Sequence, residues 1–582
     1  MKNLKARTQK LKVVLTKLGR WVSHSSLPEV FLISSFLIDR WVVNSDITYP
    51  HDMYLPLLLF AALVSGVYYL YLLVLRRNFA AHIASLLLSY VGIYAYQPLL
   101  VNRVGKLLVR LPHGSSPFTQ SVVVVLVLAL IFGLIGLSID QLIARIKQLQ
   151  HLQLHKILMF VIVFIFVWEG AQAADRLWDI RHELSYRYPA PTVQKSAATT
   201  SKPDIYFLMY EDYADATTLQ RVNNYDNSPL FSYLASQGFA NRQTGAYSNY
   251  PFTTSSLSSM LAMNYFPDLQ AQFGKDGPWQ TTFPYRSIIN NPPFAQIVKQ
   301  NGYTYNQVSS WWENSRIHIQ ADNQPTMGYR FNFLKWHFYL GDLSRDIINK
   351  SVLSPWLKKG ITLGHTTLIK YDRDYNPMEN LQVQTNALKA IANQADAAGP
   401  QFTFGHIMVP HTPYIFKPDG SLADYDGEHN DDGIPETEKY ANQAAYVNQN
   451  IQEVVGYIRQ HDPKAVVILQ SDEGSYPPQF RYVQQPGHYF NPLDLPVPDM
   501  QQKFGILASY YLPGLDAKTV SNQLSSPVNV LPFVLNNYLG YTIPRLPECH
   551  FATGNKFNLY NYTLVTQQLT GQAASAACNQ YK

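Results

Sequence analysis

Two adjacent acids, Asp472 and Glu473, follow the strand-like run VVILQ after one serine and stand directly before Gly474. A short run rich in β-branched residues and closed by a turn signal predicts a strand that is buried on both faces. The run IYFLMY likewise ends in two acids, Glu211 and Asp212. Because active sites of open α/β sheets gather beyond the strand ends, we expect these acids to meet at one edge. Carboxylates that meet there need a cation, and hard oxygen ligands suit a divalent metal; the alternative is two unrelated, solvated turns.

A pair of threonines lies at the predicted start of a helix in the stretch TTSSLSSML. Leu257, Met260 and Leu261 have helical spacing, and the Pro, Thr and Ser residues before them are typical of helix starts. A hydroxyl at this position can cap the helix. It can also act as a nucleophile that the positive helix end and a metal stabilise. Spacing alone leaves both roles open for Thr253 and Thr254.

The elements that position these residues form an α/β pattern. Strand-like runs alternate with helical stretches from Lys202 to Pro547, which predicts a catalytic domain at 202–547. A linker rich in Pro, Ser and Thr precedes it at 176–201, and a tail follows at 548–582. The net charge of +6 comes largely from segments that flank apolar runs, and the sequence has no nucleic-acid-binding module. We therefore expect no nucleic acid partner.

The N-terminal third of the chain is too apolar for a soluble domain. Five apolar segments are candidates for crossing a bilayer, which needs roughly 20 residues: 27–44, 53–75, 78–102, 117–139 and 157–174. They predict an all-α transmembrane domain of about five helices within 1–175, with four spans as the alternative. The basic N-terminus places that end in the cytoplasm, so five spans put the catalytic domain outside.

Cys549 and Cys578 are the only cysteines, and both lie in the exported part of the chain. A disulfide between them suits an oxidising exterior. Two free thiols are the alternative, because spacing does not establish geometry.

The order of these features resembles the alkaline phosphatase/sulfatase superfamily. An acid after the first strand is followed by a T-x-x-S-L helix start, a Trp-rich segment, an H-x-P-Y segment and an S-D-x-G strand end. The likeness is strongest to the membrane-anchored branch that includes lipoteichoic acid synthase and the lipid A phosphoethanolamine transferases. It implies an alkaline-phosphatase-like α/β domain with a central mixed sheet flanked by helices. It also implies a multi-pass protein of the bacterial plasma membrane with an extracytoplasmic catalytic domain.

The resemblance assigns roles to the acids and to one threonine. Glu211 and Asp472 are similar to metal ligands, and Thr253 is similar to the nucleophilic threonine, which also faces the metal. Glu473 stands where the family usually has His, so it either keeps the ligand role or marks a loss of activity. His488 is a further candidate ligand. A site made almost entirely of oxygen favours Mn²⁺ or Mg²⁺ over Zn²⁺.

The resemblance also suggests residues that contact the substrate. His411 is similar to the family histidine that contacts the transferred group, whereas His406 on the same strand is expected to be structural. Trp312 and Arg316 resemble residues that line the substrate pocket, and an arginine suits a phosphate by bidentate hydrogen bonding. A core Trp and a surface Arg are the alternative.

These features predict a metal-dependent transferase. It would move a phospho-alcohol headgroup, phosphoglycerol or phosphoethanolamine, from a membrane lipid through Thr253 to a cell-envelope glycan or lipid. A phosphodiesterase or sulfatase-like hydrolase is the first alternative, although the C/S-x-P-S-R motif that sulfatases convert to formylglycine is absent from the sequence. A catalytically inactive envelope scaffold is the second, because Glu473 replaces His and the lysine usual beside the threonine of lipoteichoic acid synthases is absent.

Overall fold

The chain forms two compact units in the computed structural model. Residues 1–181 and 328–374 make the first unit, and residues 182–327 and 375–582 make the second. The structure describes residues 25–581 apart from 95–116, 147–153, 196–201, 275–279, 317, 325–329, 334–335, 340, 352–353, 364–365, 372–376, 396–398, 424–432, 478–483, 486–487, 490 and 555–557. The basic N-terminal segment therefore lies outside the described residues, as does the end of the predicted linker, 196–201.

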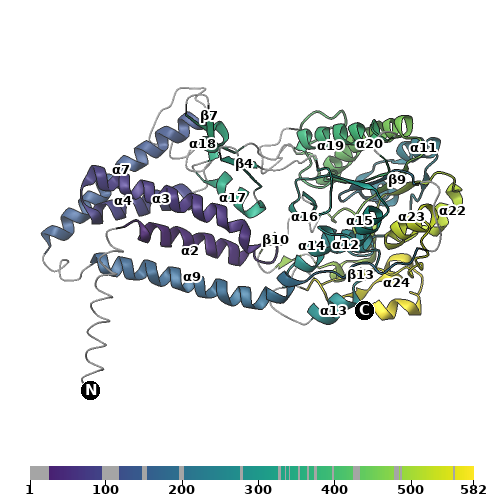
Figure 1. The fold of residues 1–582 in the computed structure, drawn as a ribbon, viewed down its shortest axis with the longest axis horizontal. Helices are drawn as coiled ribbons and strands as arrows, with labels where there is room; N and C mark the ends of the chain where they lie inside the picture. Colours follow the sequence, from purple (N-terminus) through teal and green to yellow (C-terminus); the bar gives the residue numbers. More distant parts are fainter. Residues whose placement is uncertain are drawn as a thin grey trace, which may run out of the picture. The chain divides into compact units, whose positions relative to one another are not determined.

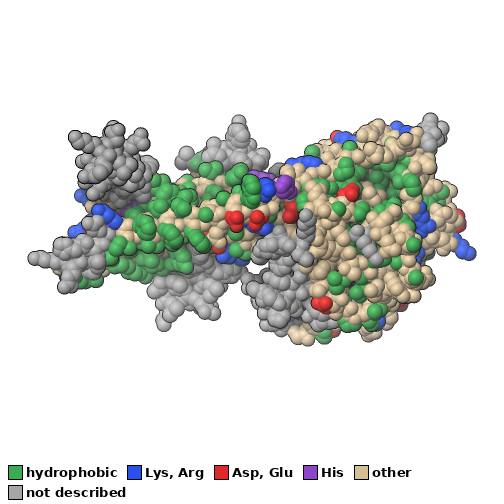
Figure 2. Space-filling model, turned by 90° about the horizontal axis from the view of Figure 1, so that it is seen from below, with side chains coloured by type: hydrophobic (Ala, Val, Ile, Leu, Met, Phe, Trp, Pro, Cys, Tyr) green, Lys and Arg blue, Asp and Glu red, His purple; other side chains and the backbone are tan. Residues whose placement is uncertain are grey.

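The first unit is built on apolar helices: α2 (Leu27–Val43), α3 (Tyr54–Leu75), α4 (Asn78–Tyr94), α7 (Pro117–Arg145) and α9 (Leu154–Ser185). Helices α2, α3, α4 and α7 pack against one another, and Figure 2 shows hydrophobic side chains gathered on the surface of this unit. Within the described part of the chain, three stretches are long and apolar enough to cross a membrane: Pro50–Leu75, Val122–Arg145 and Leu154–Ser185. Three of the five predicted spans are thus supported, whereas α2 and α4, with 17 residues each, stay a prediction as membrane spans.

Glu29 interrupts the apolar run of α2, but its carboxylate does not face outward. The side chain is fully buried, where Oε1 lies 2.8 Å from Nδ1 of His82 and accepts a hydrogen bond of 2.6 Å from Ser85. Both partners belong to α4. An acid in an apolar helix is tolerated when it faces the bundle interior and has polar partners. The carboxyl group of Glu29 therefore joins α2 to α4.

The second unit contains a six-stranded mixed sheet, as the resemblance implied (Figure 1). Its strand order is β2 (Ala240–Asn241), β12 (Ala508–Tyr511), β9 (Val466–Gln470), β1 (Ile205–Tyr210), β8 (Gln401–Ile407) and β3 (Thr304–Val308). Strands β9, β1, β8 and β3 are parallel, whereas β12 runs antiparallel to β9 and to β2. The carboxyl ends of the four parallel strands therefore lie at one edge of the sheet.

Helices cover both faces of this sheet, because its central strands are apolar on both sides. All residues of β1 and β9 are buried. Odd-numbered residues of β1 pack in one core with α12 (Thr253–Ala262), α15 (Pro293–Gln300) and α23 (Val530–Tyr538), and even-numbered ones pack in another with α19 (Pro377–Ala392) and α20 (Glu436–His461). The alternation follows from the two-residue period of a strand. The α/β fold predicted from the alternating runs is confirmed.

Shorter helices and strands complete the second unit. Most connect the sheet strands or lie near the chain's end: α10 (Ala216–Asn223), α11 (Ser228–Ser236), α13 (Pro267–Phe273), α14 (Phe283–Ile289), α16 (Glu313–Arg316), β10 (Gln484–Gln485), β11 (His488–Tyr489), η4 (Pro492–Asp494), α21 (Val497–Phe504), α22 (Ala517–Gln523), η5 (Pro527–Asn529), β13 (Phe551–Ala552), β14 (Thr563–Leu564), α24 (Thr566–Thr570) and η6 (Ala576–Tyr581). They position the ends of the long elements.

One segment is grouped differently from the predicted boundaries. Residues 328–374 follow β3 and precede β8 in the sequence, yet their contacts place them with the apolar helices. They form a separate antiparallel sheet in the order β5 (Trp336–Tyr339), β4 (Arg330–Phe333), β7 (Thr366–Tyr371) and β6 (Ile361–Leu363). Helices α17 (Asp342–Lys350) and α18 (Ser354–Lys359) belong to the same segment. We call residues 328–374 the insert.

Candidate active site

Three carboxylates converge at the carboxyl edge of the sheet. Glu211 follows β1, and Asp472 and Glu473 follow the neighbouring strand β9. One carboxylate oxygen from each lies within 4.8 Å of the others, and all three side chains are buried. The structure thus brings together the acids that the sequence placed at two strand ends.

The strand register explains why two of these acids face the same helix. Met209 of β1 is aligned with His406 of β8 and with Gln470 of β9, and Met209 belongs to the core that contains α12. Residues two positions further along a strand return to the same face. Glu211 and Asp472 each lie two positions beyond this aligned row, so both carboxylates point toward the side covered by α12.

Thr253 is the first residue of α12 and reaches the carboxylates. Its Oγ1 donates a hydrogen bond of 2.7 Å to Oε1 of Glu211. The hydroxyl of Ser256, one turn later, donates 2.6 Å to the carbonyl oxygen of Asp472 and holds the helix against the end of β9. The N-cap position belongs to Phe252, without a side-chain capping bond. The capping role considered for Thr253 or Thr254 is therefore wrong, because the helix begins one residue earlier than a threonine cap requires.

His406, expected to be structural, contacts the site directly. Its Nε2 lies 2.6 Å from Oε2 of Glu211, and its Nδ1 lies 2.7 Å from the hydroxyl of Ser315. The ring of Trp312 packs edge-on against the imidazole with 5.5 Å between centroids. Glu211 therefore holds the threonine hydroxyl on one oxygen and the histidine ring on the other. The signal in the sequence was only its position near the end of a strand parallel to the one that delivers Glu211.

His411 lies beyond the end of β8, at the rim of the cluster. Its side chain is 28% exposed, and Nε2 lies 3.8 Å from Oδ2 of Asp212. Asp212 itself has a left-handed backbone with φ of 57°, a conformation that Asp tolerates better than most residues. The sharp turn lets Glu211 and Asp212 both stay buried at the strand end. His411, one of the predicted substrate contacts, therefore lies beside the carboxylates and is accessible to solvent.

Lys503, which the sequence interpretation missed, supplies a buried cation inside the carboxylate cluster. Its Nζ lies 2.8 Å from Oε1 of Glu473 and 3.6 Å from Oδ1 of Asp212, and the side chain is fully buried. It also lies 3.3 Å from the ring centroid of Tyr476. A lysine is rarely buried unless it is paired. The ion pair with Lys503 explains how Glu473 is accommodated in the buried cluster, but no spacing in the sequence links these two residues, which are 30 positions apart.

Burial changes the protonation of these groups. It raises the pKa of Glu211 to about 7 and raises the pKa of Asp472 and of Glu473 well above their usual range, with neighbouring carboxylates adding to the effect for Asp472. Burial also lowers the pKa of His406 to about 4, so its imidazole is neutral at pH 7. Lys503 compensates only part of the negative charge of the cluster. The acids are therefore stabilised further either by protons or by an added cation.

The donor set fits a divalent cation. Oδ2 of Asp472 and Oε2 of Glu473 are buried and have no hydrogen-bond partner within the described residues. Buried oxygens without donors are costly, and a hard cation satisfies them. Glu211, Asp472 and Glu473 are the residues that would hold it. The position of Lys503 beside Glu473 favours a site in which one carboxylate is shared between an ammonium group and a metal.

Arg316 and His488 are the last two predicted site residues. Arg316 is buried in α16, and its guanidinium Nη2 donates 2.6 Å to the carbonyl oxygen of Trp311. It is thus not a surface residue, and this bond braces the segment that carries Trp312. His488 begins the two-residue strand β11, and its side chain lies outside the described residues. Its role as a ligand therefore stays a prediction.

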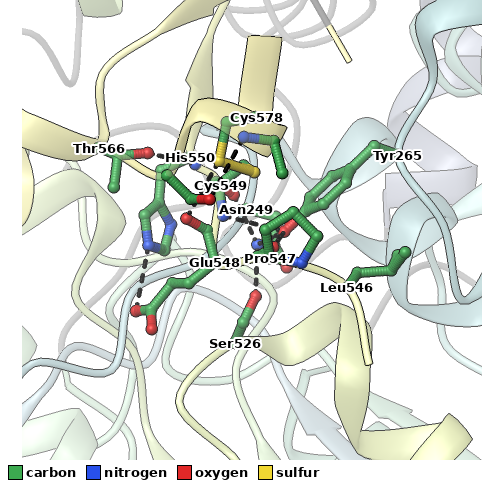
Figure 3. The surroundings of a disulfide bond; sticks show 12 residues. Asn249, Tyr265, Ser526, Leu546, Pro547, Glu548, Cys549, His550, Thr566 and Cys578 are labelled. Atoms are coloured by element: carbon green, nitrogen blue, oxygen red, sulfur yellow. Dashed lines mark hydrogen bonds and ion pairs between the residues drawn. A yellow bond between two sulfur atoms is a disulfide. The ribbon is translucent and has the colours of Figure 1, made fainter. Parts of the chain in front are cut away.

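The C-terminal tail braces the chain that leads into α12 (Figure 3). A disulfide joins Cys549 to Cys578, and both residues are fully buried. Asn249, four residues before Thr253, donates 2.9 Å to the carbonyl oxygen of Cys549 and 2.8 Å to the hydroxyl of Ser526. The tail is thus part of the second unit, and it anchors the approach to the nucleophile candidate.

A comparison with family models identifies the family of this chain. The sulfatase family model matches residues 203–537, which is more than half of the chain. The chain belongs to the sulfatase family. The resemblance to the alkaline phosphatase/sulfatase superfamily is thereby confirmed, and an enzyme of that superfamily is the coarse assignment that it supports.

Solved structures show only distant likeness to this sulfatase-family chain. The C-terminal periplasmic domain of EcEptC from Escherichia coli is 12% identical, with 63% of this chain and 94% of that one covered at a TM-score of 0.38. The soluble domain of lipooligosaccharide phosphoethanolamine transferase A from Neisseria meningitidis is 13% identical, covering 61% and 90% at 0.35. A putative sulfatase from Bacteroides thetaiotaomicron is 10% identical, covering 61% and 79% at 0.34. No curated protein matches the chain. These likenesses are too slight to bear on its substrate.

The buried ion pair gives a testable result. Replacing Lys503 with Met should strengthen Mn²⁺ binding roughly tenfold, because a positive charge that repels the ion is removed from a poorly screened site. Without metal, the same variant should lose about 3–5 kcal/mol of unfolding free energy, since Glu473 is left unpaired. Calorimetric titration with Mn²⁺ and thermal denaturation with and without chelator measure the two effects. The surface variant Lys518→Met is the control; unchanged Mn²⁺ affinity in Lys503→Met would show that the ammonium and the ion do not share the cluster.

Proposed function

We propose that the protein is a membrane-anchored, metal-dependent phosphotransferase. It takes a phospho-alcohol headgroup, phosphoglycerol or phosphoethanolamine, from a membrane lipid and passes it to a cell-envelope glycan or lipid. The observation that carries the proposal is the 2.7 Å hydrogen bond from Thr253 to Glu211 at the start of α12, inside a buried carboxylate cluster. A hydroxyl held at the positive end of a helix and next to a base has the features of an activated nucleophile.

Thr253, Glu211 and His411 have separate roles in the first half-reaction. Oγ1 of Thr253 attacks the phosphorus, and its proton passes to Oε1 of Glu211, to which it is already hydrogen bonded. The bond from phosphorus to the lipid alcohol breaks, and that oxygen takes up a proton. His411, which is partly exposed at the rim, is placed to supply it. A divalent cation, when bound, stabilises charge on the phosphoryl oxygens and on the attacking oxygen.

The second half-reaction returns the site to its starting state. An acceptor hydroxyl attacks the phosphothreonine, loses its proton to His411, and leaves the headgroup on the acceptor. Thr253 then recovers its proton from Glu211. His406 holds Oε2 of Glu211 throughout, so the carboxylate keeps its orientation while Oε1 exchanges the proton. Manganese or magnesium suits the oxygen-rich ligands better than zinc.

Two alternatives remain in view of Glu473. If water is the acceptor, the protein is a phosphodiesterase or sulfatase-like hydrolase of envelope esters. If the site binds no cation, it is an inactive envelope scaffold. The pairing of Glu473 with Lys503 leaves Oε2 of Glu473 without a donor, and this favours a metal-binding site over the scaffold.

One incubation distinguishes these functions. The full-length protein is mixed with Mn²⁺ and with phosphatidylglycerol or phosphatidylethanolamine labelled in the headgroup, and the protein is then analysed by mass spectrometry. We expect a headgroup phosphate adduct on the peptide that contains Thr253, and loss of the label from this peptide when an envelope acceptor is added. Rapid release of free headgroup phosphate without an acceptor would indicate hydrolysis instead. No adduct and no release with either lipid would contradict both enzyme functions.

A further inference from the structure

The insert lies within the catalytic part of the sequence but packs against the apolar helices. Helix α17 contacts α3 and the short helix η1 (Pro50–Met53) that precedes it, and α18 contacts α7. The hydroxyl of Ser344 donates to the carbonyl oxygen of Asp52. A Cβ at Gly341 would lie 2.9 Å from Cγ of Asp52, so the start of α17 fits closely against the same turn. The insert is therefore seated at the end of the bundle where α3 begins.

Chain connectivity indicates on which side of the membrane this end of the bundle lies. The insert is continuous with the catalytic unit at both of its ends, and none of the three membrane-crossing candidates among the described residues falls within it. It therefore remains on the side to which α9 delivers the chain. Because it contacts the turn before α3, this turn lies on the same side. The insert is consequently positioned at the lipid headgroup level of that leaflet.

The net charge of the insert is opposite in sign to the net charge of the rest of the catalytic sequence. Residues 328–374 contain eight Lys and Arg residues against four Asp and Glu residues. Residues 182–327 and 375–582 together contain 20 basic and 28 acidic residues. A basic segment inside an acidic domain is not a by-product of overall composition. Basic residues beside membrane helices are attracted to anionic lipid headgroups.

The described lysines of the insert are directed to solvent. Lys350 at the end of α17 pairs with Asp346 at 2.8 Å and still has 51% of its side chain exposed, and Lys358 and Lys359 at the end of α18 are also exposed. Lys370 of β7 is exposed as well, and its side chain lies beside Gly360, the residue that follows α18. Three of the four lysines thus gather around one turn.

Aromatic residues accompany these lysines in the sequence of the insert. It contains eight Phe, Trp and Tyr residues in 47 positions, among them Trp336 and Trp356. Trp and Tyr are enriched at the membrane interface, where their rings sit at the headgroup level. Basic and aromatic residues together are the composition expected of a segment that rests on a lipid surface.

We propose that the insert is a lipid-binding surface that contacts the anionic phospholipid headgroups of the leaflet facing the catalytic unit. Lys350, Lys358, Lys359 and Lys370 provide the positive charge, and the bundle end fixes the insert at the right depth. The proposal concerns lipids in a bilayer, not free phosphate. It does not depend on the proposed transfer reaction, because it holds equally for a hydrolase or an inactive protein.

The test compares two sets of lysine substitutions in the full-length protein. Lys350→Gln, Lys358→Gln and Lys359→Gln are combined in one variant. The matched control combines Lys417→Gln, Lys464→Gln and Lys518→Gln, which remove the same charge from exposed positions of the second unit. Each protein is kept in neutral detergent micelles and titrated with phosphatidylglycerol or phosphatidylcholine, and bound lipid is counted by native mass spectrometry. Thermal denaturation checks that both variants fold.

We expect the wild-type protein and the control to bind phosphatidylglycerol about tenfold more tightly than phosphatidylcholine at low salt, with most of the preference lost at 0.5 M NaCl. The insert variant should lose most of this preference, and inorganic phosphate at millimolar concentration should not compete. An insert variant with the wild-type preference would overturn the proposal, as would an equal loss in the control. Full competition by inorganic phosphate would indicate a free-anion site. If the insert variant does not fold, the salt dependence and the phosphate competition of the wild-type protein decide the matter.

Discussion

Thr253→Ala is expected to abolish headgroup transfer, whereas Thr254→Ala should retain most of it. Removal of a covalent nucleophile costs several orders of magnitude in rate. Oγ1 of Thr253 is the hydroxyl bonded to Glu211, and one residue along a helix turns the side chain by about 100°, so Thr254 does not share this direction. Because no threonine caps α12, Thr254→Ala should cost less than the roughly 1 kcal/mol of a lost cap. Turnover of headgroup-labelled lipid and the thermal midpoint measure the two outcomes.

The pair of variants also tests the register of the site. Thr253→Ser keeps a hydroxyl and serves as a conservative control, which should restore measurable turnover and the mass adduct. Near-normal activity in Thr253→Ala with loss in Thr254→Ala would show that the nucleophile lies one residue later. If both alanine variants stay active, a covalent threonine intermediate is ruled out. A loss of folding in Thr253→Ala is excluded separately by its thermal midpoint.

Asp472→Asn should weaken divalent metal binding at least 100-fold and reduce turnover in parallel. Changes to residues that only orient metal ligands typically cost 10–100-fold in affinity, so loss of a ligand charge should cost more. Asp472 is fully buried and its Oδ2 lacks a hydrogen-bond partner, which makes the carboxylate available to a cation. Metal content after dialysis and calorimetric titration with Mn²⁺, Mg²⁺ and Zn²⁺ give the affinity and the preferred ion.

A surface substitution of the same kind provides the control for this prediction. Asp226→Asn removes a carboxylate from an exposed position of the second unit and should change neither metal binding nor turnover. Wild-type metal affinity in Asp472→Asn would remove this residue from the ligand set. Failure of the wild-type protein to bind any of the three ions would support the inactive scaffold over both enzyme functions.

The apolar runs of the sequence determined the α/β core and the acids at its edge. VVILQ and IYFLMY are short, rich in β-branched or aromatic residues, and bounded by polar residues, so they predict buried strands. The acids that follow them then lie at a strand end by connectivity alone. The three long apolar helices follow from run length in the same way. The cysteine count and the predicted export of this part of the chain indicated the disulfide, which the structure contains.

Only the tertiary structure decided which distant side chains complete the site. His406 contacts Glu211 because β8 pairs with β1 in a register that places Met209 beside His406, and pairing across almost 200 residues leaves no local pattern. Lys503 is buried because acids from two separate strand ends lie beside its ammonium group. From the sequence alone, a single lysine is expected at the surface.

The roles of the segments at the membrane depended on the same kind of information. The sequence of α2 shows Glu29 inside an apolar run, but only the fold shows that its partners are His82 and Ser85 on another helix. The insert lies inside the catalytic sequence, but its contacts are with the apolar helices. Local sequence determines which residues are apolar, and therefore which segments become strands and membrane helices. The partner of each buried charge is set by packing between segments far apart in the chain, because the cost of burying a charge is met only by the groups that the fold brings against it.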